Sequence, residues 1–473
     1  MSRLVEGAGP AVDGDAPAQR QVAGRHRQLL VLGLAVFGVH ALSPSVQPSD
    51  SRLSVLTSWS ALTRHDFHLE RYPQVAGLSY RADLVTHNGH VLPYFPWPTL
   101  LLATPATVLA WLAGVDPASI SISDPNRTFL LEVPTASLLV ALSTVGIYLA
   151  VRRAAAVAGS HRTALLAALV FAFASSAWSV ASRALWQQTA SILFLTCAII
   201  ALQRLADDRR WAWWAGVFIP LCCLARPTDA VFAGLALLYA LLRLRAAIVR
   251  VLLPMAAVLG VFFAVSYSQY GTVLPPYYQA GHRFAEPKKL QFADAVWVNL
   301  ISPNRGLLVY DSAIVLAAVA GTVLLWRAGR LQGLELVLVL TVVAQLITIS
   351  RYGSTGGPTY GPRLMIDILP CLSVLGGPAY RWIVDQRWRR PGARHRAVVG
   401  AAAAVVLWSV FVTATGATLR AGYCWSAYPT LIDDAPHRVW DWSDPQFLRP
   451  YRDLAAGDGV RQVVAGSCKP ATG

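Results

Sequence analysis

The fold is decided by residues 397–416, AVVGAAAAVVLWSVFVTATG, a run of twenty residues without a charged side chain. A helix of about 20 apolar residues spans the hydrocarbon core of a bilayer, which is roughly 30 Å thick. Comparable runs recur along the chain, so we predict an all-α, polytopic membrane protein. The other runs lie near residues 28–46, 97–114, 130–151, 163–181, 186–204, 211–226, 228–244, 249–268, 307–326, 333–351 and 362–382.

The composition of the whole chain agrees with this class. The 473 residues are 55% hydrophobic and only 14% charged, whereas soluble proteins carry about 25% charged residues. The formal net charge of +15 would suggest nucleic-acid binding in a soluble protein. In a membrane protein, however, basic residues collect in cytoplasmic loops and set the orientation. We therefore expect the lipid bilayer, and no nucleic acid, as a partner.

Arginine-rich connectors between the runs predict the topology, because such connectors stay in the cytoplasm. Residues 1–27 are also basic, and we expect them to form a disordered cytoplasmic tail. One of the two runs between the first span and Arg152 then cannot cross the bilayer. Run 97–114 contains Pro98 and Pro105, and we expect it to be a re-entrant or juxtamembrane helix in the first external loop. The basic connectors are 152–162, 204–210, 243–250, 327–330 and 381–396.

This topology has about 11 transmembrane helices, a cytoplasmic N-terminus and an external C-terminus, in the plasma membrane or inner membrane. The membrane domain covers residues 28–416. Cys424 and Cys468 lie in the external C-terminal segment, where a disulfide between them is chemically permitted. The external segments are 47–129 with interfacial helices, 269–306 as a second loop, and 417–473.

Polar side chains gather near the predicted outer ends of the spans. Such residues are costly within a membrane and are usually functional, and a site at this depth suits an anionic, membrane-anchored substrate. Each residue also has a structural alternative, since Asp50 can be a helix N-cap, the arginines can extend to the interface, and the aromatic rings can be interfacial anchors. The set comprises Asp50, Arg52, Arg183, Trp186, Gln187, Arg226, Tyr277, Tyr278, Arg305, Tyr360 and Arg363.

The chain lacks the common nucleotide-binding motifs. It has neither a GxxxxGK[ST] loop nor a GxGxxG turn that opens a helix after a strand. Nucleotide chemistry is therefore unsupported. A sugar donor used outside the cell must carry its own activated bond, as a polyprenyl-phosphate sugar does.

Several stretches carry a family resemblance. The first external loop opens with Asp50, and HVLPYFPWP (90–98) leads into a membrane-associated helix. Together with these stretches, four others resemble the membrane glycosyltransferase C superfamily, in its branch of protein O-mannosyltransferases and aminoarabinose transferases. The architectural resemblance covers about residues 28–416. The four stretches are SRALWQQ (182–188), SPNRGLLVY (302–310), GPRLMIDILP (361–370) and WDWSDPQFLR (440–449).

The resemblance implies an inverting glycosyltransferase. Such enzymes move a sugar from a polyprenyl-phosphate donor to an acceptor hydroxyl on a glycan, lipid or protein at the outer face. A carboxylate in the first external loop takes the acceptor proton, and Asp50 occupies that position here. Arginines of later external loops bind the donor phosphate, for which guanidinium groups are well suited. We expect Arg183, Arg305, Arg363 and Arg226 to bind phosphate, and Arg52, Trp186, Gln187 and Tyr360 to bind sugar or acceptor.

Two departures from the family pattern bear on the site. The first loop offers Asp50–Ser51 rather than paired acids, and residues 182–188 lack the acidic pair that binds metal in oligosaccharyltransferase-like relatives. We therefore expect neither a required metal nor another cofactor. Asp66, Glu70 and Asp83 are rival bases in the same loop.

Two other function classes remain open at this stage. A transporter or flippase of lipid-linked sugars would place its charges near the membrane midplane. A non-catalytic envelope-assembly protein would keep the fold and tolerate the loss of Asp50.

Overall fold

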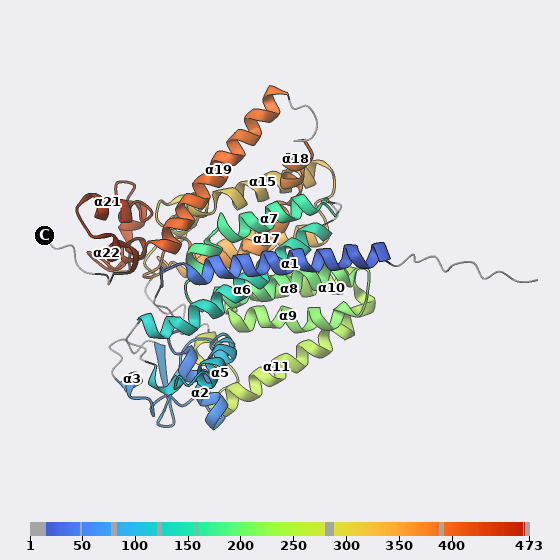
Figure 1. Ribbon diagram of the computed structural model, residues 1–473. Coiled ribbons are helices and arrows are strands. Elements are labelled where there is room, and N and C mark those ends of the chain that lie inside the picture. Colours follow the sequence, from blue (N-terminus) through green and yellow to red (C-terminus); the bar gives the residue numbers. More distant parts are fainter. Residues whose placement is uncertain are drawn as a thin grey trace, which may run out of the picture.

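A computed structural model describes residues 16–47, 50–76, 83–120, 125–154, 156–157, 159–279, 288–386, 392–466 and 468. Within these residues the fold is a bundle of helices (Figure 1). Five helices are long and apolar enough to cross a bilayer, judged by length and composition, and six shorter apolar helices accompany them. The five long helices cover Leu130–Arg153, Gln187–Leu205, Arg245–Tyr270, Leu334–Tyr352 and Ala393–Thr418.

Every apolar run that we predicted to cross the bilayer coincides with one helix or with consecutive helices. In chain order these are α1 (Ala16–Leu42), α6 (Pro125–Arg153), α7 (His161–Phe173) with the π-helical η4 (Ala177–Ala181), α8 (Gln187–Leu205), α9 (Trp211–Ala225), α10 (Ala230–Arg243), α11 (Ile248–Tyr270), α14 (Leu307–Tyr310) with α15 (Ser312–Arg327), α16 (Leu334–Tyr352), η8 (Arg363–Ile368) with α17 (Leu369–Leu375) and α18 (Gly377–Gln386), and α19 (Ala393–Thr418). Short 3-10 turns at η5 (Pro227–Asp229) and η6 (Arg245–Ala247) precede α10 and α11.

The first helix begins earlier than we expected. Helix α1 starts at Ala16, so the expectation of a disordered tail through residue 27 is wrong from that residue onward. Residues 16–27 are rich in Ala, Gln and Arg, which are good helix formers. Extension of an existing helix adds one hydrogen bond for each residue that it orders. Residues 1–15 of the predicted tail lie outside the described part of the chain.

The arginine-rich connectors meet at one end of the bundle, which we call the Arg-rich end. A cavity of about 580 Å³ there is lined by residues from three different connectors, among them Arg153, Asp207 and Arg243. A fourth connector joins them through Arg381, which donates a hydrogen bond to the carbonyl of Val157. The grouping agrees with the prediction that these connectors face the same compartment.

The opposite end of the bundle, which we call the loop end, carries the first loop and the C-terminal segment (Figure 1). The run 97–114 folds as α4 (Trp97–Leu100), η2 (Leu101–Ala103) and α5 (Thr104–Leu112). The Thr99 hydroxyl lies 3.4 Å from the carbonyl of Ala225, the last residue of α9. In Figure 1, α5 lies at the loop end, where α1 ends and α6 begins, so this run does not pass along the bundle.

A β-hairpin stands within the first loop. Strand β1 (Leu84–His87) pairs antiparallel with β2 (His90–Pro93), and Asn88 and Gly89 both have positive φ, as a tight hairpin turn requires. The backbone N–H of Tyr94 donates to the carbonyl of Asp83 at 2.8 Å. The hairpin therefore brings Asp83 and Tyr94 side by side. The other elements of this loop are α2 (Ser54–Arg64), α3 (Pro73–Ala76) and η3 (Pro117–Ser119).

The C-terminal segment packs on the loop end and is closed by a disulfide between Cys424 and Cys468. Gln446 fixes the segment to the bundle: its backbone N–H donates to Asn304 at 2.6 Å, and its side-chain carbonyl accepts from the N–H of Gly361 at 3.0 Å. The segment contains α20 (Arg420–Cys424), η9 (Pro436–Trp440), α21 (Arg449–Ala455) and α22 (Val460–Ala465), and the second loop contains η7 (Pro276–Tyr278) and α13 (Phe292–Ile301).

Candidate active site

The segment that leads to Asp50 is held by a buried arginine. Arg183 is fully buried and donates to the carbonyls of Ser43 at 2.6 Å and Ser45 at 3.3 Å, and also to that of His40. Its own carbonyl accepts from the N–H of Gln47 at 3.3 Å. With its guanidinium surrounded by backbone oxygens, Arg183 orders the end of α1 and the residues after it up to Gln47. Arg183 is therefore a buried structural residue whose guanidinium is occupied by backbone carbonyls, and it is not placed to bind a phosphate as we expected.

Arg183→Met is expected to lower stability markedly, because it leaves several buried carbonyls unpaired. A buried carbonyl that is left without its hydrogen-bond partner costs about 1–3 kcal/mol. We expect the melting temperature in detergent to fall by several degrees, as measured by thermal unfolding of the purified protein. The matched control is Arg209→Met, since Arg209 is exposed in a connector at the Arg-rich end. Equal melting temperatures for the two variants would contradict this role.

Asp50 forms an ion pair with Arg363, the first residue of η8. The side chains are 20% and 13% exposed, respectively, so the pair is sheltered but reachable. The Arg363 guanidinium also lies over the ring of Trp186, 3.8 Å from its centroid. A guanidinium that is stacked on an aromatic face keeps its orientation. Three expected site residues from distant parts of the sequence thus meet at one point.

Gln187 connects this ion pair to an aromatic group. Its side-chain N–H donates to Asp50 at 3.5 Å, and its side-chain carbonyl accepts from the hydroxyl of Tyr277. The ring of Tyr277 packs edge-on against Tyr94 and Phe95, with centroids 5.4 and 5.6 Å away. The three rings form an aromatic wall that Gln187 connects to the carboxylate; Tyr94 and Phe95 are partly exposed, whereas Tyr277 is buried. Such rings can pack against the apolar face of a sugar.

Arg52 pairs with Asp83 rather than with Asp50. The distance from Arg52 Nε to Asp83 Oδ2 is 3.0 Å, and the Asp83 side chain is only 5% exposed. Burial raises the pKa of the Asp83 carboxyl from 3.8 to about 6, against the opposing effect of Arg52; Asp50 raises it further and Arg363 lowers it. Arg52, Asp83, Asp50 and Arg363 therefore act on one another electrostatically.

The raised pKa of Asp83 predicts a pH-dependent difference in stability between the wild type and Asp83→Asn. Between about pH 4 and pH 6 the unfolded chain ionises at this residue before the folded chain does, so the wild type loses stability as the pH rises through this window. The shift corresponds to about 3 kcal/mol in total, and Asp83→Asn has no such proton to lose. The melting temperature of the variant minus that of the wild type should increase from pH 4 to pH 6 and stay constant above it. A difference that does not change across this window would contradict the assignment; Asp434→Asn, at an exposed tail residue, is the control.

The structure also contains a carboxylate that sequence reasoning missed. Glu132 is fully buried near the start of α6 and accepts hydrogen bonds from Ser51 at 2.6 Å and Ser54 at 2.9 Å. It thereby fixes the residue that follows Asp50 and the first turn of α2. The available signal was a lone acidic residue inside the apolar run 130–151.

Two further arginines that we expected at the phosphate stabilise the surrounding fold. Arg226 forms a buried ion pair with Asp367 and donates to the carbonyl of Leu364 at 2.9 Å, so it supports the turn that presents Arg363. Arg305 donates to the carbonyls of Asn304 and Thr355, both at 2.7 Å, and of Gly357 at 3.0 Å, and to the side chain of Gln446 at 3.0 Å. Both are nearly fully buried. Only Arg363 of the four expected arginines is paired with Asp50.

Tyr360 lies in the core rather than beside the aromatic wall. Its side chain is fully buried, and its hydroxyl donates to the carbonyl of Val412 at 2.8 Å. The ring is enclosed by Gly416 and Gly422, where an added Cβ would approach it to 2.2 and 2.9 Å. Tyr360 therefore joins α19 to the loop before η8, and it is not placed to bind a sugar.

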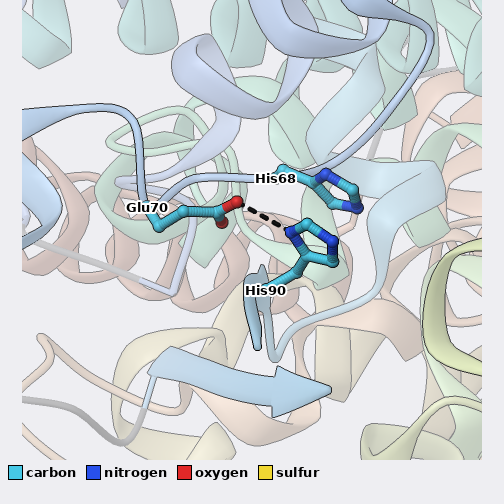
Figure 2. Close-up of side chains that lie close together, drawn as sticks. All are labelled: His68, Glu70 and His90. Atoms are coloured by element: carbon cyan, nitrogen blue, oxygen red, sulfur yellow. Dashed lines mark hydrogen bonds and ion pairs between the residues drawn. The ribbon is translucent and has the colours of Figure 1, made fainter. Parts of the chain in front are cut away.

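The rival bases Asp66 and Glu70 are held by local contacts. Asp66 accepts from Ser60 at 2.6 Å and from Arg71 at 2.8 Å. Glu70 accepts from His90 and from the N–H of Val91, both at 2.9 Å. Glu70 belongs to a cluster with His68 and His90 whose ligand atoms lie within 4.8 Å of one another, a spacing that could hold a metal ion (Figure 2).

Comparison with known proteins gives similarity at the level of structure alone. No protein-family model matches the sequence, and a search of curated proteins finds no relative. The solved structures that are similar include ArnT from Cupriavidus metallidurans in the apo state, at 15% identity and a TM-score of 0.48, covering 90% of this chain and 76% of that one. The oligosaccharyltransferase of Archaeoglobus fulgidus with a tethered acceptor peptide follows, at 13% identity and a TM-score of 0.46, covering 87% of this chain and 59% of that one.

A second structure of the archaeal enzyme, AglB in complex with an inhibitory peptide and a dolichol-phosphate, has 12% identity and a TM-score of 0.43, covering 88% of this chain and 60% of that one. ArnT and AglB are members of the glycosyltransferase C superfamily, the one that the sequence resembles. Because these TM-scores lie below 0.5, they carry no inference about activity.

Proposed function

We propose that the chain is an inverting glycosyltransferase that uses a polyprenyl-phosphate sugar. Asp50 accepts the proton of an acceptor hydroxyl, and the hydroxyl oxygen forms a bond to the anomeric carbon of the sugar. The bond between that carbon and the phosphate oxygen breaks, and the phosphate leaves on its lipid with the electron pair. A single displacement of this kind inverts the anomeric configuration. No cofactor is needed, because a carboxylate and a guanidinium provide the base and the countercharge.

The observation that carries the proposal is the contact between Asp50 and Arg363. The two groups needed for the displacement, a base and a cation for the leaving phosphate, lie within one ion pair. Trp186 keeps the guanidinium oriented, and fixed positive charge stabilises negative charge as it develops in the transition state. When a donor phosphate binds, Arg363 can contact it through one N–H group and stay near Asp50 through another.

The aromatic wall gives this site a place for the sugar. Tyr94, Phe95 and Tyr277 lie beside Gln187, which also contacts Asp50. Gln187 can donate to a sugar hydroxyl while the rings pack against the ring face. Arg52 pairs with Asp83, whose carbonyl accepts from the N–H of Tyr94, and from there it can help to orient the acceptor.

The proposed orientation places the loop end outside the cell. The Arg-rich end then faces the cytoplasm, in agreement with the distribution of basic residues in membrane proteins. The disulfide between Cys424 and Cys468 fits an oxidising compartment. The partners on this view are the bilayer, the lipid-linked donor, and an acceptor glycan, lipid or protein of the cell envelope.

The test is a transfer assay with a panel of radiolabelled polyprenyl-phosphate sugars. Membranes with and without the protein are incubated with each donor, and the label that leaves the lipid fraction for glycan, glycolipid or protein is counted. We expect transfer from at least one donor only where the protein is present. Movement of intact labelled donor across the bilayer without transfer would support a flippase instead. Absence of both would contradict a role in lipid-linked sugar chemistry.

A further inference from the structure

The cluster of His68, Glu70 and His90 lies in the first loop and has no part in the proposed transfer step. His90 Nδ1 is 2.9 Å from Glu70 Oε1, and the two imidazole rings lie almost parallel with centroids 3.7 Å apart (Figure 2). The side chains are 23%, 35% and 47% exposed, in chain order. Two histidines and a glutamate thus converge at the surface with room for a further ligand.

The chemistry of this donor set is that of a metal site. Two imidazole nitrogens and one carboxylate oxygen, with an open fourth position for water, suit Zn²⁺. In a tetrahedral zinc site the ligand atoms lie about 3.4 Å apart. The three ligand atoms here lie within 4.8 Å of one another. Because the two imidazole rings are stacked at an interplanar angle of 7°, at least one ring must turn about its side-chain bonds to direct its nitrogen lone pair at a shared ion. The partial exposure of the three side chains leaves them free to make this change.

The residues around the cluster already orient it. The second oxygen of Glu70 accepts from the N–H of Val91 at 2.9 Å, which fixes the direction of the carboxylate. Asp66 Oδ2 lies 3.6 Å from His68 Nδ1, and the same carboxylate accepts from Ser60 and Arg71. Carboxylates behind a metal-binding histidine commonly set its orientation.

We propose that His68, Glu70 and His90 bind one divalent transition-metal ion, with Zn²⁺ as the ion that suits them best. The site joins two parts of the first loop. His68 and Glu70 follow α2, whereas His90 opens β2, and the N–H of Leu69 donates to the carbonyl of Val91 at 2.8 Å. A bound ion would lock the hairpin to the segment after α2.

This role goes beyond the proposed transfer reaction and does not depend on it. The ion would be structural, because it would join His90, the first residue of β2, to His68 and Glu70 in the segment after α2. It would still matter for the active site, because the two ends of the hairpin are Asp83 and Tyr94. Loss of the ion would loosen the pairing of these two residues.

The test uses the purified full chain with an affinity tag that contains no histidine. After treatment with a chelator, Zn²⁺ binding is measured by calorimetry and elemental analysis for the wild type, Glu70→Gln and His90→Gln. His65→Gln is the control, since His65 is an exposed histidine of the same loop outside the cluster. We expect one ion for each wild-type and His65→Gln chain. Both cluster variants should bind at least about 100-fold more weakly, because changes behind a ligand alone cost about 10–100-fold.

A second readout follows stability rather than transfer. Zn²⁺ should raise the melting temperature of the wild type and of His65→Gln, since a ligand that binds only the folded state stabilises it, and should leave that of His90→Gln unchanged. Lack of binding at micromolar Zn²⁺, or equal binding by the wild type and the cluster variants, would overturn the proposal. Neither of these metal-binding results measures sugar transfer. The metal-site proposal and the glycosyltransferase proposal can therefore be contradicted independently.

Discussion

Asp50→Asn is expected to lower the initial rate of sugar transfer by about 10²–10⁴-fold, the usual effect of removing a general base. Asparagine is nearly isosteric with aspartate and can keep the hydrogen bond with Gln187, but it cannot take the acceptor proton. The measurement is the initial rate of label transfer at equal protein levels. The melting temperature of the variant should fall by no more than a few degrees, because asparagine keeps the shape of the side chain but loses the charge that pairs with the partly exposed Arg363.

Asp66→Asn is the control for this substitution, since Asp66 lies in the same loop and is held by Ser60 and Arg71. Its rate should remain within a few-fold of the wild type. Equal rates for the wild type and Asp50→Asn would remove Asp50 as the base. Asp83 would then be the next candidate for the base, because its raised pKa of about 6 suits proton transfer near neutral pH.

Arg363→Gln is expected to lower the rate by about 10²–10³-fold, the effect of removing one group that stabilises developing charge. The loss should fall mainly on kcat, because the phosphate gains most of its negative charge as the bond to the sugar breaks. Arg363→Lys should recover part of the rate, since it restores the charge without the planar fork that stacks on Trp186.

The control is Arg351→Gln, an exposed arginine at the end of α16 on the same side of the bundle. It should leave both kcat and KM near the wild-type values. If Arg363→Gln raised KM alone, the guanidinium would hold donor and transition state equally. The proposed role in the displacement would then be wrong.

The helical bundle could be predicted from the sequence because each helix is determined by the apolar residues of its own segment. Each apolar run such as 397–416 must form a helix to satisfy its backbone in lipid, and each is found as helix in the structure. The meeting of three basic connectors at one cavity agrees with the expectation that such connectors face one compartment. Pro98 and Pro105 also gave the reason to expect that run 97–114 does not form one straight transmembrane helix.

The individual roles of the arginines could not be read in this way. Arg183, Arg226, Arg305 and Arg363 all lie near helix ends, and in the sequence they look equivalent. Their tertiary contacts distinguish them. Arg183 donates to three backbone carbonyls and Arg226 pairs with Asp367. Arg305 donates to Gln446, and of the four only Arg363 pairs with Asp50. Sequence periodicity carries no information on which buried acceptor a long side chain will reach.

The hairpin and its cluster were missed for a related reason. His68 and His90 are 22 positions apart, and only the pairing of β1 with β2 and the bond from Leu69 to Val91 bring them together. Short strands have weak apolar patterns, so we used the stretch 90–98 for its family resemblance and did not predict a hairpin there. Asp83 and Tyr94 were likewise separate features until the hairpin joined them.

The most direct test of the central claim is the anomeric configuration of the first product. With a donor identified in the panel, the product of purified wild-type protein is analysed by NMR before any rearrangement. One base, Asp50, and one phosphate-binding cation, Arg363, perform a single displacement, which predicts a product with the configuration opposite to that of the donor. Retention would require a covalent sugar–enzyme intermediate on a second carboxylate, and it would contradict the account.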